Sequence, residues 1–230
     1  MPFELGRRKL KIPLLAYVSG FSVLIPIAIG LYKRKSLEEG LKWLWWLLLF
    51  ELATSSGQLI LNVHRITNLW LSHIFVLVEF SLVVCICSKW VETPNKRTLL
   101  RAVIVLFGLL WIGSRFSFEP LGAPSSYVSP IAKAGLIVIS MYIIFLIAQT
   151  SEELFKDPRY WVVSGIIISS AGSLLFYAFR GIIDKFGRDE LFIAYSIHWG
   201  IQIIANIIYS IGFLCTQPTH SSGGPLASAR

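Results

Sequence analysis

The chain has 230 residues, of which 55% are hydrophobic and only 15% are charged. Soluble domains usually contain about 45 to 50% apolar residues, so this composition excludes an ordinary water-soluble fold. The formal net charge is +8, but the cations lie in short clusters between apolar runs. Such clusters are typical of loops beside lipid headgroups, and no continuous basic face predicts a nucleic-acid partner.

The apolar residues fall into runs that are long enough to cross a bilayer. A helix needs about 20 residues to span about 30 Å of hydrocarbon at 1.5 Å per residue. Seven runs meet or approach that length, at residues 12–32, 41–63, 69–90, 99–114, 130–150, 160–179 and 191–215. The sequence therefore predicts an all-α membrane protein, a bundle of seven transmembrane helices.

The first four runs differ in how clearly they are marked. Basic clusters flank the run at 12–32, and its apolar stretch exceeds the 7 to 15 residues of a signal-peptide core. The second run opens with an aromatic cluster that includes Trp45, where an interfacial belt is expected. The fourth run, 99–114, is short and predicts a marginal crossing.

The remaining runs and their connectors complete the organisation. The fifth run begins at Pro130, a favourable first position for a helix, and we expect Lys133 nearby to extend to the headgroups. The connectors are short and rich in Pro, Gly and charge, which leaves no room for a soluble domain. We expect a single transmembrane domain at 1–215 and a flexible C-terminal tail at 216–230.

The sequence gives a weak indication of orientation. Lys and Arg are nearly equal in number on the two sides of the seven runs, so the positive-inside rule does not decide. The first and third connectors are both strongly basic, whereas the second contains only Arg65. On this basis we expect an N-terminus outside and a C-terminus in the cytoplasm of a bacterial inner membrane.

Polar side chains recur at helical spacing within four of the runs. At 100° per residue, the four in the second run lie within about 60° of one another. The third, sixth and seventh runs have similar rows. The rows are Glu51, Ser55, Gln58 and Asn62; Asn68, Ser72 and Glu79, with His73 next to them; Ser169, Ser173, Tyr177 and Arg180; and Tyr195, His198, Gln202, Asn206 and Tyr209.

These rows predict a shared polar interior. Ionisable groups in hydrocarbon cost on the order of 2.5 to 3.5 kcal/mol on insertion scales, so they usually face the inside of a bundle. The predicted binding residues are Glu51, Gln58, His73, Glu79, His198, Gln202 and Asn206. An alternative for the amides and hydroxyls is that they only form hydrogen bonds between helices. The histidines lack the spacing of a metal-binding motif, and the sequence predicts no particular cofactor.

One stretch also resembles a known group of proteins. The run 68–80 contains Asn68, His73 and the pair Glu79-Phe80, an Asn-x4-His-x5-Glu-Phe pattern. It is similar to the third helix of uncharacterised seven-span bacterial membrane proteins, frequent in Bacteroidetes-type genomes. The resemblance implies a seven-helix bundle, and some bacterial modules of this size are sensor inputs to signalling kinases. The last run has no lysine, which argues against a retinal-binding rhodopsin.

We therefore favour a function without catalysis. The polar interior predicts a receptor-like or accessory subunit that binds a small molecule, a lipid or a partner protein in the membrane. Two alternatives remain at this point. Glu51 and Glu79 could exchange protons in a proton-coupled transporter or channel, or glutamates and histidines could hold a metal in an intramembrane hydrolase.

Overall fold

The computed structural model describes residues 14–64, 66–123, 125–183 and 188–216, with the backbone alone at 178–183 and 188–191. All regular structure in these ranges is helical. Seven segments are long and apolar enough to cross a membrane, which confirms the predicted bundle of seven transmembrane helices. The apolar outer surface then faces lipid.

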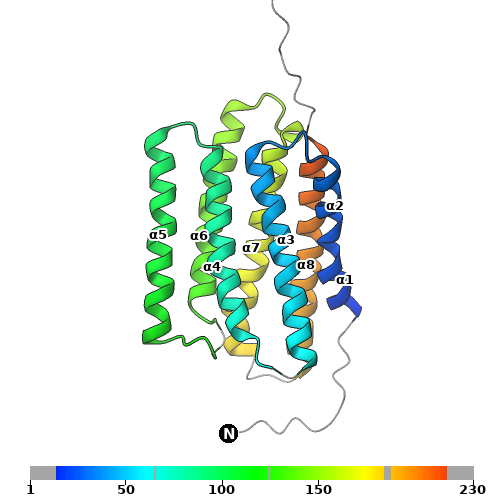
Figure 1. The fold of residues 1–230 in the computed structure, drawn as a ribbon, viewed down its shortest axis with the longest axis vertical. Helices are drawn as coiled ribbons and strands as arrows, with labels where there is room; N and C mark the ends of the chain where they lie inside the picture. The colour runs from blue at the N-terminus through cyan, green and yellow to red at the C-terminus, as the bar shows by residue number, and fades with distance from the viewer. Residues whose placement is uncertain (1–13, 65, 124, 184–187, 217–230) are drawn as a thin grey trace, which may run out of the picture.

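The first span is two helices, where the sequence predicted one. α1 covers Leu14–Ser22 and α2 covers Leu24–Tyr32. Pro26 explains the interruption, because proline has no N–H to donate to the carbonyl of Ser22 and its ring crowds that carbonyl. The chain therefore bends near the middle of the span, and α1 and α2 run past α8 as separate pieces (Figure 1).

The next three spans follow in an up-and-down order. α3 covers Glu39–Val63, α4 covers Leu69–Lys89 and α5 covers Pro94–Ser117. α5 is 24 residues long, so it is a full crossing rather than the marginal one predicted at 99–114. The helix is longer than the apolar run because its ends include charged residues, and Arg97 near its start folds back to donate to the carbonyl of Val91.

The last three spans complete the bundle. α6 covers Val128–Thr150, a single 3-10 turn, η1, covers Leu154–Lys156, α7 covers Pro158–Ile183 and α8 covers Arg188–Leu214. α7 packs against α6 and α8, whereas α5 lies at one edge beside α4 and α6 (Figure 1).

Small residues bring α7 and α8 close together. A β-carbon added at Gly165 would lie 2.5 Å from the ring of Tyr209, and one added at Gly172 would lie 2.6 Å from Ile201. Both distances are far below van der Waals contact, so only glycine fits at these two positions. This close approach places the polar rows of α7 and α8 side by side.

Candidate functional site: a polar cavity in one half of the bundle

A cavity of about 660 Å³ lies among the helices in the half of the bundle that contains the α3–α4 connection. Its wall includes residues from α1, α3, α4, α6, α7 and α8. Asn62, near the end of α3, and Asn68, just before α4, both line it. The cavity therefore extends from the middle of the bundle to the membrane surface at that end.

The four polar rows meet at this cavity. Every member of the α3 row lines it, as do Asn68, Ser72 and Glu79 of the α4 row. The α7 and α8 rows contribute Ser169, Ser173, Tyr177, Tyr195, His198 and Gln202. Of the seven predicted binding residues, the structure brings five together here: Glu51, Gln58, Glu79, His198 and Gln202.

Glu51 is held by a neutral hydrogen-bond chain across three helices. The amide Nε2 of Gln202 donates to Glu51 Oε1 at 2.9 Å, and Ser169 Oγ donates to Gln202 Oε1 at 3.2 Å. Among the described residues, no Lys, Arg or His forms an ion pair with Glu51. Its second carboxylate oxygen has no hydrogen-bond partner in the described part of the chain. Glu51 thus has no cationic partner in the part of the chain that the structure describes.

Glu79 has the opposite environment. Lys133 Nζ lies 2.6 Å from each of its two carboxylate oxygens. The Lys133 side chain is only 5% exposed and that of Glu79 14% exposed. The expectation that Lys133 reaches the headgroups is therefore wrong. α6 begins at Val128, so Lys133 lies inside the helix, and its ammonium pairs with Glu79.

Amides and hydroxyls line the cavity nearer the membrane surface. Gln58 Nε2 donates to Ser72 Oγ at 3.0 Å, and Asn68 Nδ2 donates to the backbone carbonyl of Gln58 at 3.2 Å. These bonds join α3 to α4, as the alternative of simple interhelical hydrogen bonding predicts. The same three residues also line the cavity, so each of them both joins the helices and forms part of the cavity wall.

Aromatic rings form the wall on the α7 and α8 side. The ring centroid of Phe176 lies 4.7 Å from that of Tyr195 and 5.1 Å from that of His198. Tyr195 in turn lies 5.6 Å from Trp199. The buried Nδ1 atom of His198 has no hydrogen-bond partner among the described residues. This wall therefore combines aromatic rings with one buried nitrogen that has no hydrogen-bond partner in the described part of the chain.

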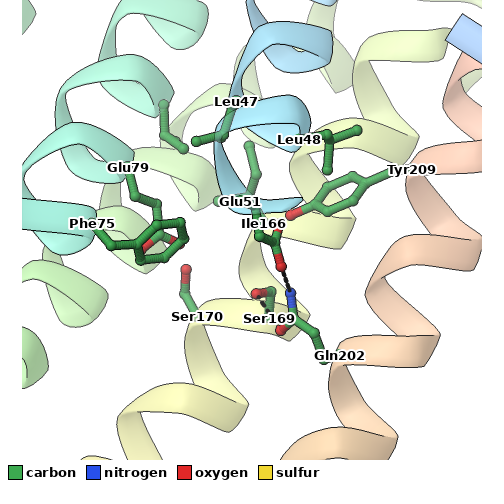
Figure 2. A pocket seen from close by; sticks show the side chains of 11 residues that line it. Leu47, Leu48, Glu51, Phe75, Glu79, Ile166, Ser169, Ser170, Gln202 and Tyr209 are labelled. Atoms are coloured by element: carbon green, nitrogen blue, oxygen red, sulfur yellow. Dashed lines mark hydrogen bonds between the residues drawn. The ribbon is translucent and has the colours of Figure 1, made fainter. Parts of the chain in front are cut away.

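A second, much smaller hole lies at the deep end of the cavity. It measures about 20 Å³ and is lined by Glu51, Glu79, Ser169, Ser170, Tyr209 and neighbouring apolar residues. A volume of about 10 to 15 Å³ on this measure is enough for one water molecule with polar partners. Figure 2 shows Glu51 between Gln202 and Tyr209, with Glu79 across from it on α4. Leu47 and Leu48 close the hole on the side away from the cavity.

His73 does not line the cavity. It is buried on the other side of α4, where Arg115 Nη1 lies 2.5 Å from its Nδ1 and the carbonyl of Ala123 lies 2.8 Å from its Nε2. Arg115 also pairs with Glu119 at 2.9 Å, and both side chains are almost completely buried. Because guanidinium only donates, Nδ1 accepts and Nε2 carries the proton that bonds to Ala123.

The same cluster caps α6. The Glu119 carboxylate accepts hydrogen bonds from the backbone N–H groups of Ser126, Tyr127 and Val128, at the start of that helix. A carboxylate at a helix N-terminus satisfies donors that have no partner in the helix and interacts favourably with its dipole. The cluster of His73, Arg115 and Glu119 is therefore a structural link between α4, α5 and α6.

Asn206, a further member of the polar rows, is not among the residues that line the cavity. Asn206 is buried one turn beyond Gln202, where its Nδ2 donates to Ser22 Oγ at 2.8 Å, next to the break between α1 and α2. The side chain of Arg180 lies outside the described residues. Within the described ranges, no three His, Cys, Asp or Glu side chains form a group suited to a metal ion.

The fold and the cavity define a seven-span integral membrane protein with a polar intramembrane chamber. No family model, no curated protein and no solved structure matches this chain. The geometry of the cavity is thus the basis for a functional assignment.

Proposed function

We propose that this protein binds a small molecule in the cavity and acts as a receptor-like or accessory subunit of the membrane. The observation that carries the proposal is the meeting of Glu51, Glu79, His198 and Gln202, from three helices, on one cavity of about 660 Å³. Sites for small molecules measure about 300 to 1,000 Å³ and combine apolar walls with a few convergent polar groups.

The polar groups are also more numerous than helix packing requires. Interhelical bonds account for Gln58, Ser72, Gln202 and Ser169. They leave the buried Nδ1 atom of His198 without a hydrogen-bond partner in the described part of the chain. Of the two Glu51 oxygens, Oε1 accepts the hydrogen bond from Gln202. Buried polar groups are costly without partners, which supports a ligand as the missing partner.

The proposal extends to location and access. We place the protein in a bacterial inner membrane with the α3–α4 end outside, as the basic first and third connectors favour. The cavity then faces the outside and receives its ligand from there or from the outer leaflet. A membrane protein that responds to the ligand is the partner such a subunit would need.

The test is whether a small molecule copurifies with the wild-type protein and is lost from a variant with a bulky side chain at the cavity wall. Gly20 lines the cavity, and a β-carbon added there meets no atom within 4 Å, so Gly20→Phe adds a bulky ring at the cavity wall. Gly108 on α5 is equally open but does not line the cavity, so Gly108→Phe is the matched control. Native mass spectrometry should detect a small molecule on the wild-type and control proteins but not on Gly20→Phe. Equal retention by all three would contradict the proposal.

A second candidate is proton-coupled transport, which the water-sized hole between Glu51 and Glu79 favours. A water there could pass a proton between the two carboxyl groups. Leu47, Leu48 and Val83 line its deep side, so transport would require these side chains to move. Vesicles containing the protein and a pH-sensitive dye would test it, and no proton movement with or without candidate solutes would reject it.

A further inference from the structure

We propose that the ligand is an organic cation, an amine or quaternary ammonium with an apolar body, and that Glu51 is its counter-ion. This inference rests on the proposed function and names the ligand class of the same cavity.

Charge in the cavity points to a cation. The acidic and basic residues among its lining residues are Glu51, Glu79, Lys133 and His198. Lys133 and Glu79 neutralise each other through contacts of 2.6 Å, so Glu51 is the carboxyl group that no cation among the described side chains balances. An ammonium group beside its unbonded oxygen would supply the missing charge, whereas an anionic ligand would meet repulsion.

The shape of the Glu51 environment leaves room for that contact. Gln202 occupies only Oε1, and the amide chain through Ser169 fixes the carboxyl plane between α3 and α8. Glu51 lines both the large cavity and the hole beyond it, so its carboxyl group is reached from the cavity. A fixed carboxylate is a better counter-ion than a mobile one because less side-chain entropy is lost on binding.

Aromatic rings provide the second half of the site. Phe75 from α4, Phe176 from α7, and Tyr195 and Trp199 from α8 all line the cavity. The faces of such rings attract ammonium groups within about 6 Å and pack against apolar groups. A primary or quaternary ammonium with a ring or alkyl body matches this combination better than a sugar, which would require more hydrogen-bond donors and acceptors along the walls.

The experiment uses three probes of similar size on the full-length protein in an uncharged detergent. The probes are benzyltrimethylammonium, its uncharged isostere neopentylbenzene, and phenylacetate. Each is titrated to millimolar concentration while binding is followed by intrinsic tryptophan fluorescence and thermal stability. We expect binding of the ammonium compound and at least about tenfold weaker binding of the other two, since truncating a desolvated ion pair typically has an effect of that size or more.

Variants identify the counter-ion. Glu51→Gln keeps a side chain of the same size that can still accept a hydrogen bond from Gln202. It should weaken binding of the ammonium compound about tenfold or more and leave binding of neopentylbenzene unchanged. Glu153→Gln makes the same chemical change at an exposed site on the α6–α7 connection and should change neither. If Glu51→Gln does not fold, the order of the three probes on the wild-type protein still decides.

The outcomes separate the ligand class from the proposed function. Three results would each overturn the proposal that the ligand is a cation. They are equal binding of the ammonium compound and its isostere, an unchanged affinity of Glu51→Gln for the ammonium compound, and no binding of the ammonium compound. A neutral or anionic molecule that copurifies with wild type and is lost from Gly20→Phe would overturn it too, yet would support the cavity as a ligand site. If no small molecule copurifies with the wild-type protein and no probe binds to it, the proposed function is rejected as well.

Discussion

Lys133 Nζ on α6 contacts both carboxylate oxygens of Glu79 on α4, at 2.6 Å each, within the membrane-spanning part of the bundle. A buried pair of this kind adds little net stability, but removing one partner leaves the other charge without compensation. Lys133→Met should therefore destabilise the protein by about 3 kcal/mol, measured as a lower midpoint of thermal unfolding.

The double variant is the informative comparison for this pair. Lys133→Met combined with Glu79→Gln removes both charges and should recover most of the lost stability. If the two single changes simply add in the double variant, the contact between these side chains has no energetic role.

Glu119 should matter for stability and not for binding. It accepts from three backbone N–H groups at the start of α6 and pairs with Arg115, and its side chain is 2% exposed. Glu119→Ala should cost about 3 kcal/mol or more by leaving Arg115 and these donors unsatisfied. At a temperature where the variant is folded, its affinity for benzyltrimethylammonium should equal that of the wild type. A selective loss of affinity would place this cluster in the binding site.

Gly165 tests the close packing of α7 on α8. Gly165→Ala places a methyl group 2.5 Å from the ring of Tyr209, so the ring or the helix backbones must shift, at a cost of about 1 to 3 kcal/mol. Gly108→Ala on α5 meets no neighbouring atom within 4 Å, and it should be neutral or stabilise by up to about 1 kcal/mol through helix propensity. Equal unfolding midpoints for the two variants would argue against the tight α7–α8 contact.

The proposed orientation gives a labelling prediction. His64 lies at the end of α3 and Lys35 lies in the α2–α3 connection, both exposed and at opposite ends of the bundle (Figure 1). In a variant without native cysteines, His64→Cys should react with a membrane-impermeant maleimide on intact cells, and Lys35→Cys should react only after lysis. The reverse pattern would place the cavity opening in the cytoplasm.

Periodicity in the sequence predicts most of the cavity wall. Glu51, Gln58 and Gln202 were identified because polar residues at helical spacing in an apolar run must share a face, and that face turns inward. The same reasoning missed Lys133, because hydropathy places a charge near a helix end without showing which neighbour it can reach. The long lysine stem covers the distance to Glu79 only because α4 and α6 pack together.

His73 shows a second limit of the sequence. It lies one residue after Ser72, about 100° around the helix, and so faces α5 rather than the cavity. Only the packing of α4 beside α5 reveals that Arg115 is its partner. The break near Pro26 has a sequence signal, a proline inside an apolar run, because proline interrupts the hydrogen bonding of the turn before it.

The most direct measurement is a high-resolution density map of the protein purified from its own membrane in mild detergent. We expect density for a small molecule among α3, α4, α7 and α8, with a polar atom within hydrogen-bond distance of Glu51 or Gln202. A map in which the cavity has closed, or in which it contains only water molecules, would contradict a ligand site there.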